Sequence, residues 1–495
     1  MNDSKNNKKR IGLTRTQLFL SLLITFIVGV VGAYALMRIS SRPNEELAIE
    51  ETGEQKTEID IETLFATPNE LNVVNQLYTI LKTSYFEEID SDILIEGALE
   101  GMAGAVGDPY TEYLDEIEST SFEEDISGSF EGIGAEVMKD GEFVRIVSPI
   151  ANSPAEAVGL QPNDFIVEID GESVIDMTLN EAVSLIRGPE GSDVELLIER
   201  GDNRMTVVLT RATIPIETVY YEIDDQDPTI GYVKIVNFNL PTYEETITAI
   251  EDLQEQGIEK IVFDVRGNPG GLLTTAIQLA NIFVPNGEPL MRTEYREDEE
   301  PTVYLASDEY GEFKYEGEAI LLIDEGSASA SEILAGAMHS VDIPLVGQTT
   351  FGKGTVQSVV SLGESDEVKF TSGRWLTAEG DWINEDGIKP DIEVSLPDYV
   401  NLFVINPTEI YEEGQNSPEI ENLKSVLSTL GYSVSENSQY DETVVKAVSS
   451  YQTENDLTVD GIVTEQTARS LTDSLRGLIE ENDTQYNAAV EALQN

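Results

Sequence analysis

The 495-residue sequence contains no cysteine and a single histidine, His339. The absence of cysteine excludes disulfides, cysteine nucleophiles and thiolate metal sites. One histidine also excludes almost every histidine-based zinc site and leaves only one candidate base for a Ser–His–Asp triad. We therefore expect no metal site and no cofactor.

Basic residues are also scarce, with 29 Lys and Arg against 94 Asp and Glu and a net charge of −65. This charge disfavours nucleic acids and anionic lipid surfaces as partners, because like charges repel. Hydrophobic residues make up 40% and charged residues 25% of the chain, which is a globular composition. The length predicts about three domains.

One long uncharged run, residues 18–37, lies near the N-terminus behind five basic residues. At ~1.5 Å per residue, a helix of this length spans the ~30 Å hydrocarbon core of a bilayer. A cleaved signal peptide is the alternative, but its apolar region is shorter, about 7–15 residues. We predict a cytoplasmic tail at 1–17 and a single-pass transmembrane helix at 18–37. The positive-inside rule then places the rest of the chain outside the cell membrane.

The remainder divides into seven segments by its changes of pattern. The predicted fold is multidomain, combining α+β and α/β units. The segments are an acidic linker at 38–65, a helical arm at 66–115, a small β-domain at 116–211, an α/β domain at 212–400, a linker at 401–416, a compact helical unit at 417–475 and an acidic helical tail at 476–495. We expect the arm to serve in packing or in a homodimer, and the tail shows no recognisable chemistry.

Three serines, Ser327, Ser329 and Ser331, occupy a predicted strand-to-helix turn in the α/β domain. A serine at a helix N-terminus lies among free N–H groups that stabilise an oxyanion, although serines also simply cap helices. His339 follows Ser329 by ten residues on the same predicted helix, about 15 Å along its axis. His339 is therefore not the base.

Lysine is the remaining base, as in Ser–Lys variants of the triad. Lys353 lies in a loop between two apolar strands and is flanked by Gly352 and Gly354. Burial would lower its pKa toward neutrality, as a base requires, and Gln357 is placed to orient it. The alternative is an ordinary exposed loop lysine.

The sequence GNPGG, residues 267–271, follows a predicted strand and precedes a helix. Such glycines present backbone N–H groups outward, so Gly271 and the N–H of Ala330 are candidates for an oxyanion hole. A phosphate-binding loop is the competing interpretation, but the GK[ST] ending is missing.

The motifs NPGG, GSASASEI and FGKGTVQ, in this order, resemble the C-terminal processing peptidase family. Two further stretches, MAGAVGDPYTEYL at 102–114 and GIKPDIEV at 387–394, match it as well. The resemblance implies a serine endopeptidase with a Ser–Lys dyad and a crotonase-like spiral core, without metal or cofactor. It implies Ser329 as nucleophile, Lys353 as base and Gln357 as its orienting partner.

The β-domain resembles a PDZ domain, with Gly132, Ile133 and Gly134 in the carboxylate-binding loop. A PDZ domain adds a peptide as a strand and holds its terminal carboxylate on backbone N–H groups. Arg187 is expected to attract that carboxylate or to switch the protease. The alternative is a charge that favours the C-terminus of a helix.

The helical unit at 417–475 resembles a three-helix peptidoglycan-binding domain. Its matching residues include Leu430, Tyr432, Tyr451, Asp460 and Gly461. Peptidoglycan is therefore an expected partner, beside the C-terminal tails of exported or membrane-associated proteins as substrate. The role expected for such cleavage is the processing of a signalling protein or a wall enzyme. The alternatives are an anchored non-catalytic scaffold and an acyl-transferring enzyme on the same core.

Overall fold

The computed structural model describes residues 71–494, except 202, 225, 297–299 and 364. The predicted transmembrane helix at 18–37 and the acidic linker at 38–65 lie outside the described residues. Within the described part of the chain, no helix is long and apolar enough to cross a membrane.

The predicted arm contains two helices, α3 (Asn72–Ser84) and α4 (Ser91–Gly104). No residue of α3 is buried, although the helix carries apolar side chains along its length. A short strand, β1 (Glu112–Leu114), and a further helix, α5 (Glu116–Ser127), then connect the arm to the β-domain. The carboxylate of Asp115 caps α5 by accepting hydrogen bonds from two backbone N–H groups.

The β-domain is built on an antiparallel sheet of six strands. Its strands run in the order β3 (Ala135–Asp140), β4 (Phe143–Pro149), β5 (Phe165–Ile169), β7 (Asp193–Arg200) and β8 (Asn203–Thr210), with β6 (Glu172–Ser173) paired to β5. Two helices, α6 (Pro154–Ala157) and α7 (Leu179–Ile186), accompany the sheet, and β2 (Ser129–Gly132) pairs with β9 (Ala212–Pro215). The strand β3 lies at an edge of the sheet, because within the described chain it pairs only with β4.

The α/β domain contains a six-stranded, mostly parallel sheet. Its order is β10 (Val219–Ile223), β11 (Ile230–Ile235), β12 (Lys260–Asp264), β15 (Glu318–Ile323), β16 (Leu345–Gly347) and β19 (Ile392–Glu393), with β10 antiparallel. Strands buried on both faces read as continuous apolar runs, which explains the patterns KIVFD and AILLI.

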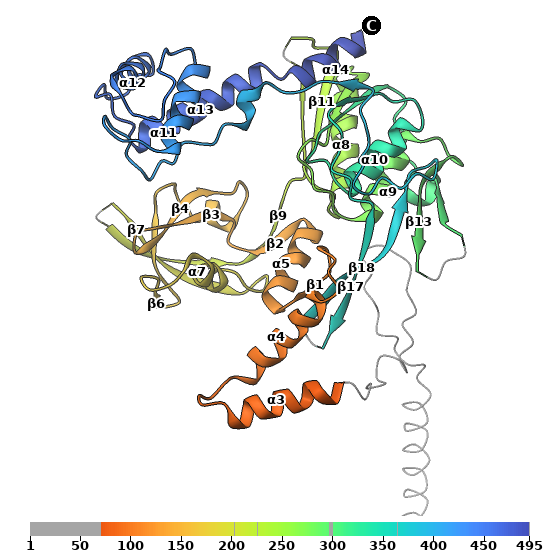
Figure 1. Cartoon of the computed structure of the whole chain (residues 1–495), viewed down its shortest axis with the longest axis horizontal. Coiled ribbons are helices and arrows are strands. Elements are labelled where there is room, and N and C mark those ends of the chain that lie inside the picture. Colours follow the sequence, from red (N-terminus) through yellow and green to blue (C-terminus); the bar gives the residue numbers. More distant parts are fainter. Residues whose placement is uncertain (1–70, 202, 225, 297–299, 364, 495) are drawn as a thin grey trace, which may run out of the picture. The chain divides into compact units, whose positions relative to one another are not determined.

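The two faces of this sheet are covered by different helices (Figure 1). Alternate side chains such as Ile261 and Phe263 belong to the large core with α8 (Thr242–Glu255), α9 (Leu273–Phe283) and α10 (Ala330–His339). The intervening side chain, Val262, belongs to a second cluster with α14 (Thr484–Gln494). The acidic tail predicted at 476–495 is therefore helical, and its last helix packs on the sheet.

A second sheet joins the arm to this domain. Its strands are β1, β18 (Asp366–Leu376), β13 (Pro289–Tyr295) and β14 (Thr302–Leu305), with β17 (Thr355–Leu362) paired to β18. Because β1 pairs with β18, the turn that precedes β1 is held next to Thr371 of that strand.

The C-terminal unit packs α11 (Pro418–Thr429), α12 (Glu442–Glu454) and α13 (Glu465–Glu481) around one apolar core. The segment at 401–416, predicted as a linker, contributes Ile405 and Tyr411 to that core. Only two residues separate α13 from α14, so the C-terminal unit is tied to the sheet at both of its ends.

Candidate active site

The three predicted motifs leave the same edge of the parallel sheet. The GNPGG loop follows β12, the serine turn follows β15, and the Lys353 loop follows β16, three strands that are neighbours in the sheet. The carboxyl ends of parallel strands meet at one edge, where ligands commonly bind in such sheets. The topology therefore brings motifs that are far apart in sequence to one place.

The serine turn distinguishes its three hydroxyl groups. Ser327 is buried and donates to the carbonyl of Val265 at 2.8 Å, and Ser331 is buried and donates to the carbonyl of Asn268 at 2.9 Å. Both therefore fasten the turn to the glycine loop. Ser329 alone lines the cavity at this edge, with the backbone at φ 54° and ψ −111°. A positive φ in a serine costs about 1–3 kcal/mol, and strain of this kind clusters at functional sites.

A cavity of about 260 Å³ contains every predicted residue of the catalytic site. Ser329, Lys353, Gln357, Gly271 and Ala330 all contribute to its lining. Apolar side chains complete the walls, including Phe238, Leu272, Ile333 and Trp375. Such a pocket, mostly apolar with a few convergent polar groups, is typical of a binding site for substrate.

The glycine loop presents unpaired donors to the cavity. Among the described residues, neither the N–H of Gly271 nor that of Ala330 has a hydrogen-bond partner. Gly271 has φ 146°, and a Cβ there would lie 2.3 Å from the carbonyl oxygen of Phe238. Glycine is therefore required, because any side chain would push the loop away from Phe238.

Lys353 is partly buried, and its Nζ lies 4.5 Å from the centre of the Tyr110 ring. Burial and then the positive charge of Lys369 hold the pKa of Lys353 below its ordinary value, while Glu332 and Asp108 oppose that shift. Within the described chain, the ammonium forms no hydrogen bond or ion pair. The lowered pKa makes the neutral amine more accessible than in a free lysine, and the neutral amine is the form that accepts a proton.

A buried carboxylate joins the serine turn to the lysine loop. Glu332 is fully buried, and its Oε2 accepts hydrogen bonds from the backbone N–H of both Ser329 and Lys353 at 2.8 Å. Its Oε1 accepts from Thr350 at 2.6 Å and from Gly352 at 2.7 Å. One side chain thus fixes the backbones that carry both candidate catalytic groups. The spacing S-x-x-E, typical of a helix capping box, is the sequence signal for it.

Gln357 lies in the cavity wall but does not contact Lys353 by a hydrogen bond. Its Nε2 donates to Thr355 at 3.0 Å and to Thr371 at 3.3 Å. Thr371 in turn donates to Asp108 at 2.7 Å. Among the described residues, no hydrogen bond joins Gln357 to Lys353 as expected; the Nε2 group instead links Gln357 to the arm through Thr371.

The arm thus contributes two residues, Tyr110 and Asp108, that the motif analysis did not assign to the site. Both belong to the stretch MAGAVGDPYTEYL, which forms part of the family resemblance. His339, in contrast, lies half-exposed at the C-terminal end of α10, with Nε2 3.3 Å from Asp391. It does not line the cavity.

The predicted peptide-binding residues of the β-domain lie at the start of the edge strand β3. Ile133 is buried, and the carbonyl of Gly134 accepts from Ile150 at 2.8 Å and from Ser153 at 2.9 Å. Gly134 has φ 72°, and a Cβ there would lie 2.3 Å from the Cβ of Ser153. The loop is therefore tightly packed beside an unpaired strand edge.

Arg187 ends α7 as its C-cap residue, but its charge is already compensated. It forms an ion pair with Glu124 of α5, and its guanidinium lies 5.2 Å from the centre of the Phe130 ring. The residue thus links the β-domain to the helix that also supplies Phe122 and Asp125 to the cavity wall. Within the described residues, no cluster of three or more acidic or histidine side chains could hold a metal.

Family profiles cover most of the chain. Peptidase family S41 matches residues 229–394, and the N-terminal domain of the activating protease CtpB matches 26–118. A PDZ domain matches 145–200, and a peptidoglycan binding domain matches 416–471. The matches follow the order of the domains in the structure.

Complete relatives are similar along nearly the whole chain. Carboxy-terminal processing protease CtpA of Bacillus subtilis (strain 168) is 40% identical over 424 residues, which cover 85% of this chain and 90% of that protein. A CtpA-like serine protease of Staphylococcus aureus (strain N315) is 35% identical over 474 residues, covering 95% of this chain and 91% of the relative. A solved photosystem II D1 C-terminal processing protease is 27% identical, covers 67% of this chain and 95% of its own, and has a TM-score of 0.39.

Proposed function

Because this chain belongs to peptidase family S41, among the carboxy-terminal processing proteases, we propose that it cleaves exported or membrane-associated proteins near their C-termini. Its serine-type peptidase chemistry is assigned to Ser329 as nucleophile and Lys353 as base. This assignment is supported by one cavity whose lining combines the strained Ser329 and the partly buried Lys353 with Gly271 and Ala330, whose N–H groups have no partner among the described residues.

The proposed reaction needs only groups of this chain. Neutral Lys353 takes the proton of the Ser329 hydroxyl while Oγ forms a bond to the scissile carbonyl carbon. The N–H groups of Gly271 and Ala330 stabilise the oxyanion. Lys353 then gives its proton to the leaving amine as the C–N bond breaks. Lys353 takes a proton from water, whose oxygen attacks the carbonyl carbon of the acyl-enzyme. Lys353 then returns that proton to Oγ as the ester C–O bond breaks, which releases the new C-terminus and regenerates Ser329.

We propose that the substrate tail binds the PDZ domain along β3. That strand has an unpaired edge, which accepts a peptide by strand addition. The backbone of Gly132, Ile133 and Gly134 would then hold the terminal carboxylate. Arg187, paired with Glu124, is proposed to transmit binding to α5 rather than to contact the carboxylate directly.

The surroundings of the enzyme are part of the same proposal. A single-pass anchor at residues 18–37 would place the catalytic part outside the cell membrane, beside the peptidoglycan that the C-terminal unit would bind. The exposed apolar residues of the arm, among them Leu77 and Phe86, support a homodimer. Cleavage of an anchored signalling protein would make the peptidase a step in signal transduction.

The direct test uses the full-length chain in detergent micelles and an unstructured protein with an apolar C-terminal tail. The matched control is Ser329→Ala. We expect the wild-type chain to shorten the substrate from its C-terminal side and Ser329→Ala to leave it intact. Equal cleavage by both would refute the nucleophile. Cleavage that did not depend on the apolar tail would refute the proposed role of the PDZ domain.

A further inference from the structure

The last helix of the chain completes the hydrophobic core of the peptidase domain. Ala489 is fully buried and Leu493 is 5% exposed, and both belong to the cluster formed with Val262, Leu322 and Val346 of the central strands. At its far end, the carbonyl of Leu493 accepts from Lys260 at 2.6 Å. The helix α14 thus covers the sheet face opposite α8, α9 and α10.

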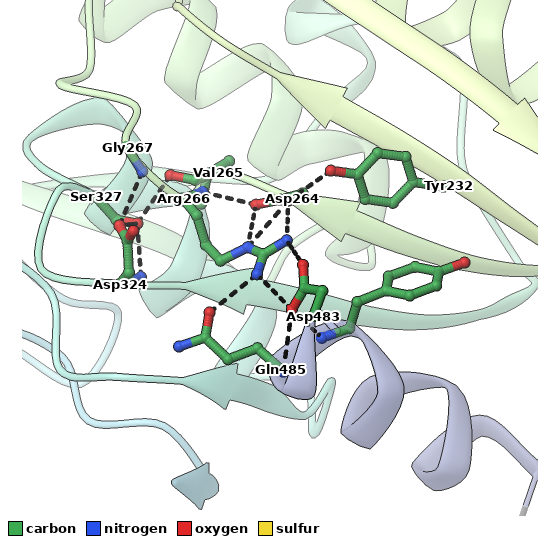
Figure 2. A network of polar contacts seen from close by, with 10 residues as sticks. Tyr232, Asp264, Val265, Arg266, Gly267, Asp324, Ser327, Asp483 and Gln485 are labelled. Atoms are coloured by element: carbon green, nitrogen blue, oxygen red, sulfur yellow. Dashed lines mark hydrogen bonds and ion pairs between the residues drawn. The ribbon is translucent and has the colours of Figure 1, made fainter. Parts of the chain in front are cut away.

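The beginning of the same helix holds Arg266, which lies two residues beyond the end of β12 (Figure 2). Arg266 donates to Asp483 at 2.7 Å from one terminal nitrogen, and to Asp483 at 3.0 Å and Gln485 at 2.9 Å from the other. Asp264 accepts from the same guanidinium and also from the hydroxyl of Tyr232 at 2.6 Å. Arg266 is only 12% exposed in its side chain, so its charge depends on these partners.

Arg266 is the residue directly before the GNPGG loop. The next residue, Gly267, donates its N–H to Asp324 at 2.8 Å, and Asp324 is itself bound to the serine turn through Ser327. Figure 2 shows these contacts as one continuous network from α14 to the serine turn. Beyond Gly267, the carbonyl of Asn268 accepts from Ala328 at 3.0 Å and from Ser331 at 2.9 Å.

We propose that Asp483 and Gln485 are positioning residues for the peptidase reaction, acting through Arg266 on the loop that carries the Gly271 N–H. With α14 seated, Arg266 fixes the first residue of the loop, and the loop fixes the oxyanion donors. The predicted change in turnover rests on the proposed function. The predicted change in the order of the loop does not depend on that function. Because two residues join α13 to α14, it also makes the C-terminal unit part of the catalytic assembly.

The test substitutes Asp483 in the full chain. In the part of the chain that the structure describes, Asp483→Ala leaves Arg266 with only Asp264 as a carboxylate partner. We expect kcat to fall about 10–100-fold, with KM within about twofold. Asp483→Asn retains an acceptor oxygen, and we expect it to recover part of that loss. The matched control, Tyr486→Phe, removes a hydrogen bond to Asp224 from the same helix without touching Arg266. It is expected to keep the wild-type kcat.

Hydrogen exchange of the peptide covering residues 266–272 provides a readout that does not require turnover. We expect exchange to accelerate at least about tenfold in Asp483→Ala and to stay at the wild-type rate in Tyr486→Phe. Unchanged exchange in Asp483→Ala would overturn the inference, whether or not the chain cleaves a substrate. An equal acceleration in Tyr486→Phe would also overturn it, because helix docking in general would then be responsible. Failure of wild-type cleavage alone would count against the proposed function.

Discussion

Gly271→Ala probes the oxyanion loop most directly. The added methyl carbon would lie 2.3 Å from the carbonyl oxygen of Phe238 and 2.8 Å from its carbonyl carbon. Ordinary van der Waals contacts begin near ~3.5 Å, so either the glycine loop or the segment that carries Phe238 must move by about 1 Å. A misplacement of that size costs about 100-fold in rate, or about 2.7 kcal/mol in the activation barrier.

The assay is cleavage of the apolar-tailed substrate, with kcat and KM measured separately. We expect kcat to fall about 100-fold in Gly271→Ala, because the N–H donor leaves its position while the rest of the cavity remains. A serine-directed fluorophosphonate probe should label Ser329 correspondingly more slowly. Circular dichroism and thermal unfolding establish that the variant is folded.

Gly257→Ala is the matched control. Gly257 also has a positive φ, 87°, but a Cβ there meets nothing within 4 Å and the residue lies outside the cavity. It should lose about 1–2 kcal/mol of stability for the left-handed conformation and retain the wild-type kcat. A folded Gly271→Ala that turned over within about threefold of wild type would refute the assignment of this loop to transition-state stabilisation.

Four further substitutions test the other parts of the site. Lys353→Met should abolish turnover in a folded chain, whereas the wild-type rate should rise with pH through the lowered pKa of Lys353, measured from pH ~6 to ~10. Lys369→Met should raise the pKa of Lys353 and move the rising limb of kcat/KM to higher pH. Asp108→Asn should lower the same pKa and move the limb to lower pH. If both variants shifted the limb in the same direction, the electrostatic explanation of the Lys353 pKa would be wrong. Glu332→Gln should lower the free energy of unfolding by about 2–4 kcal/mol in a urea titration and also reduce kcat, because four donors bind this buried carboxylate. An unchanged free energy of unfolding would show that these hydrogen bonds do not stabilise the fold.

Short-range signals were enough for the local elements of the site. The sequence predicted a strand before GNPGG and another before GSASAS, and β12 and β15 lie at those places. The glycines around Lys353 indicated a loop that brings the lysine to the site by its backbone. The structure places Ser329 and Lys353 in the lining of one cavity, and their catalytic roles stay predictions.

The orienting contact of Gln357 illustrates where local reasoning ends. Gln357 lies four positions after Lys353 in the sequence. In the structure, however, the pairing of β17 with β18 shifts register between Val356 and Gln357, and Gln357 contacts Thr371 on β18. Cross-strand neighbours, rather than sequence neighbours, decide the partners of a strand side chain. That contact also brings the arm to the site, through Asp108.

The sequence by itself indicated the α/β and β-rich parts and the glycine loop, because each depends on residue type and spacing within about ten positions. The resemblance of its motifs to the processing peptidases named Ser329 and Lys353 as candidate nucleophile and base. Only the tertiary structure decided which distant groups surround them. Tyr110 meets Lys353, Glu332 joins two loops, and Asp483 holds Arg266, all through strand order and helix docking. The spacing of Tyr486, Ala489 and Leu493 marks one face of α14 as apolar, but spacing alone names no partner for that face. The partner is the sheet, because burying that face against Val262 and Leu322 removes apolar surface from water.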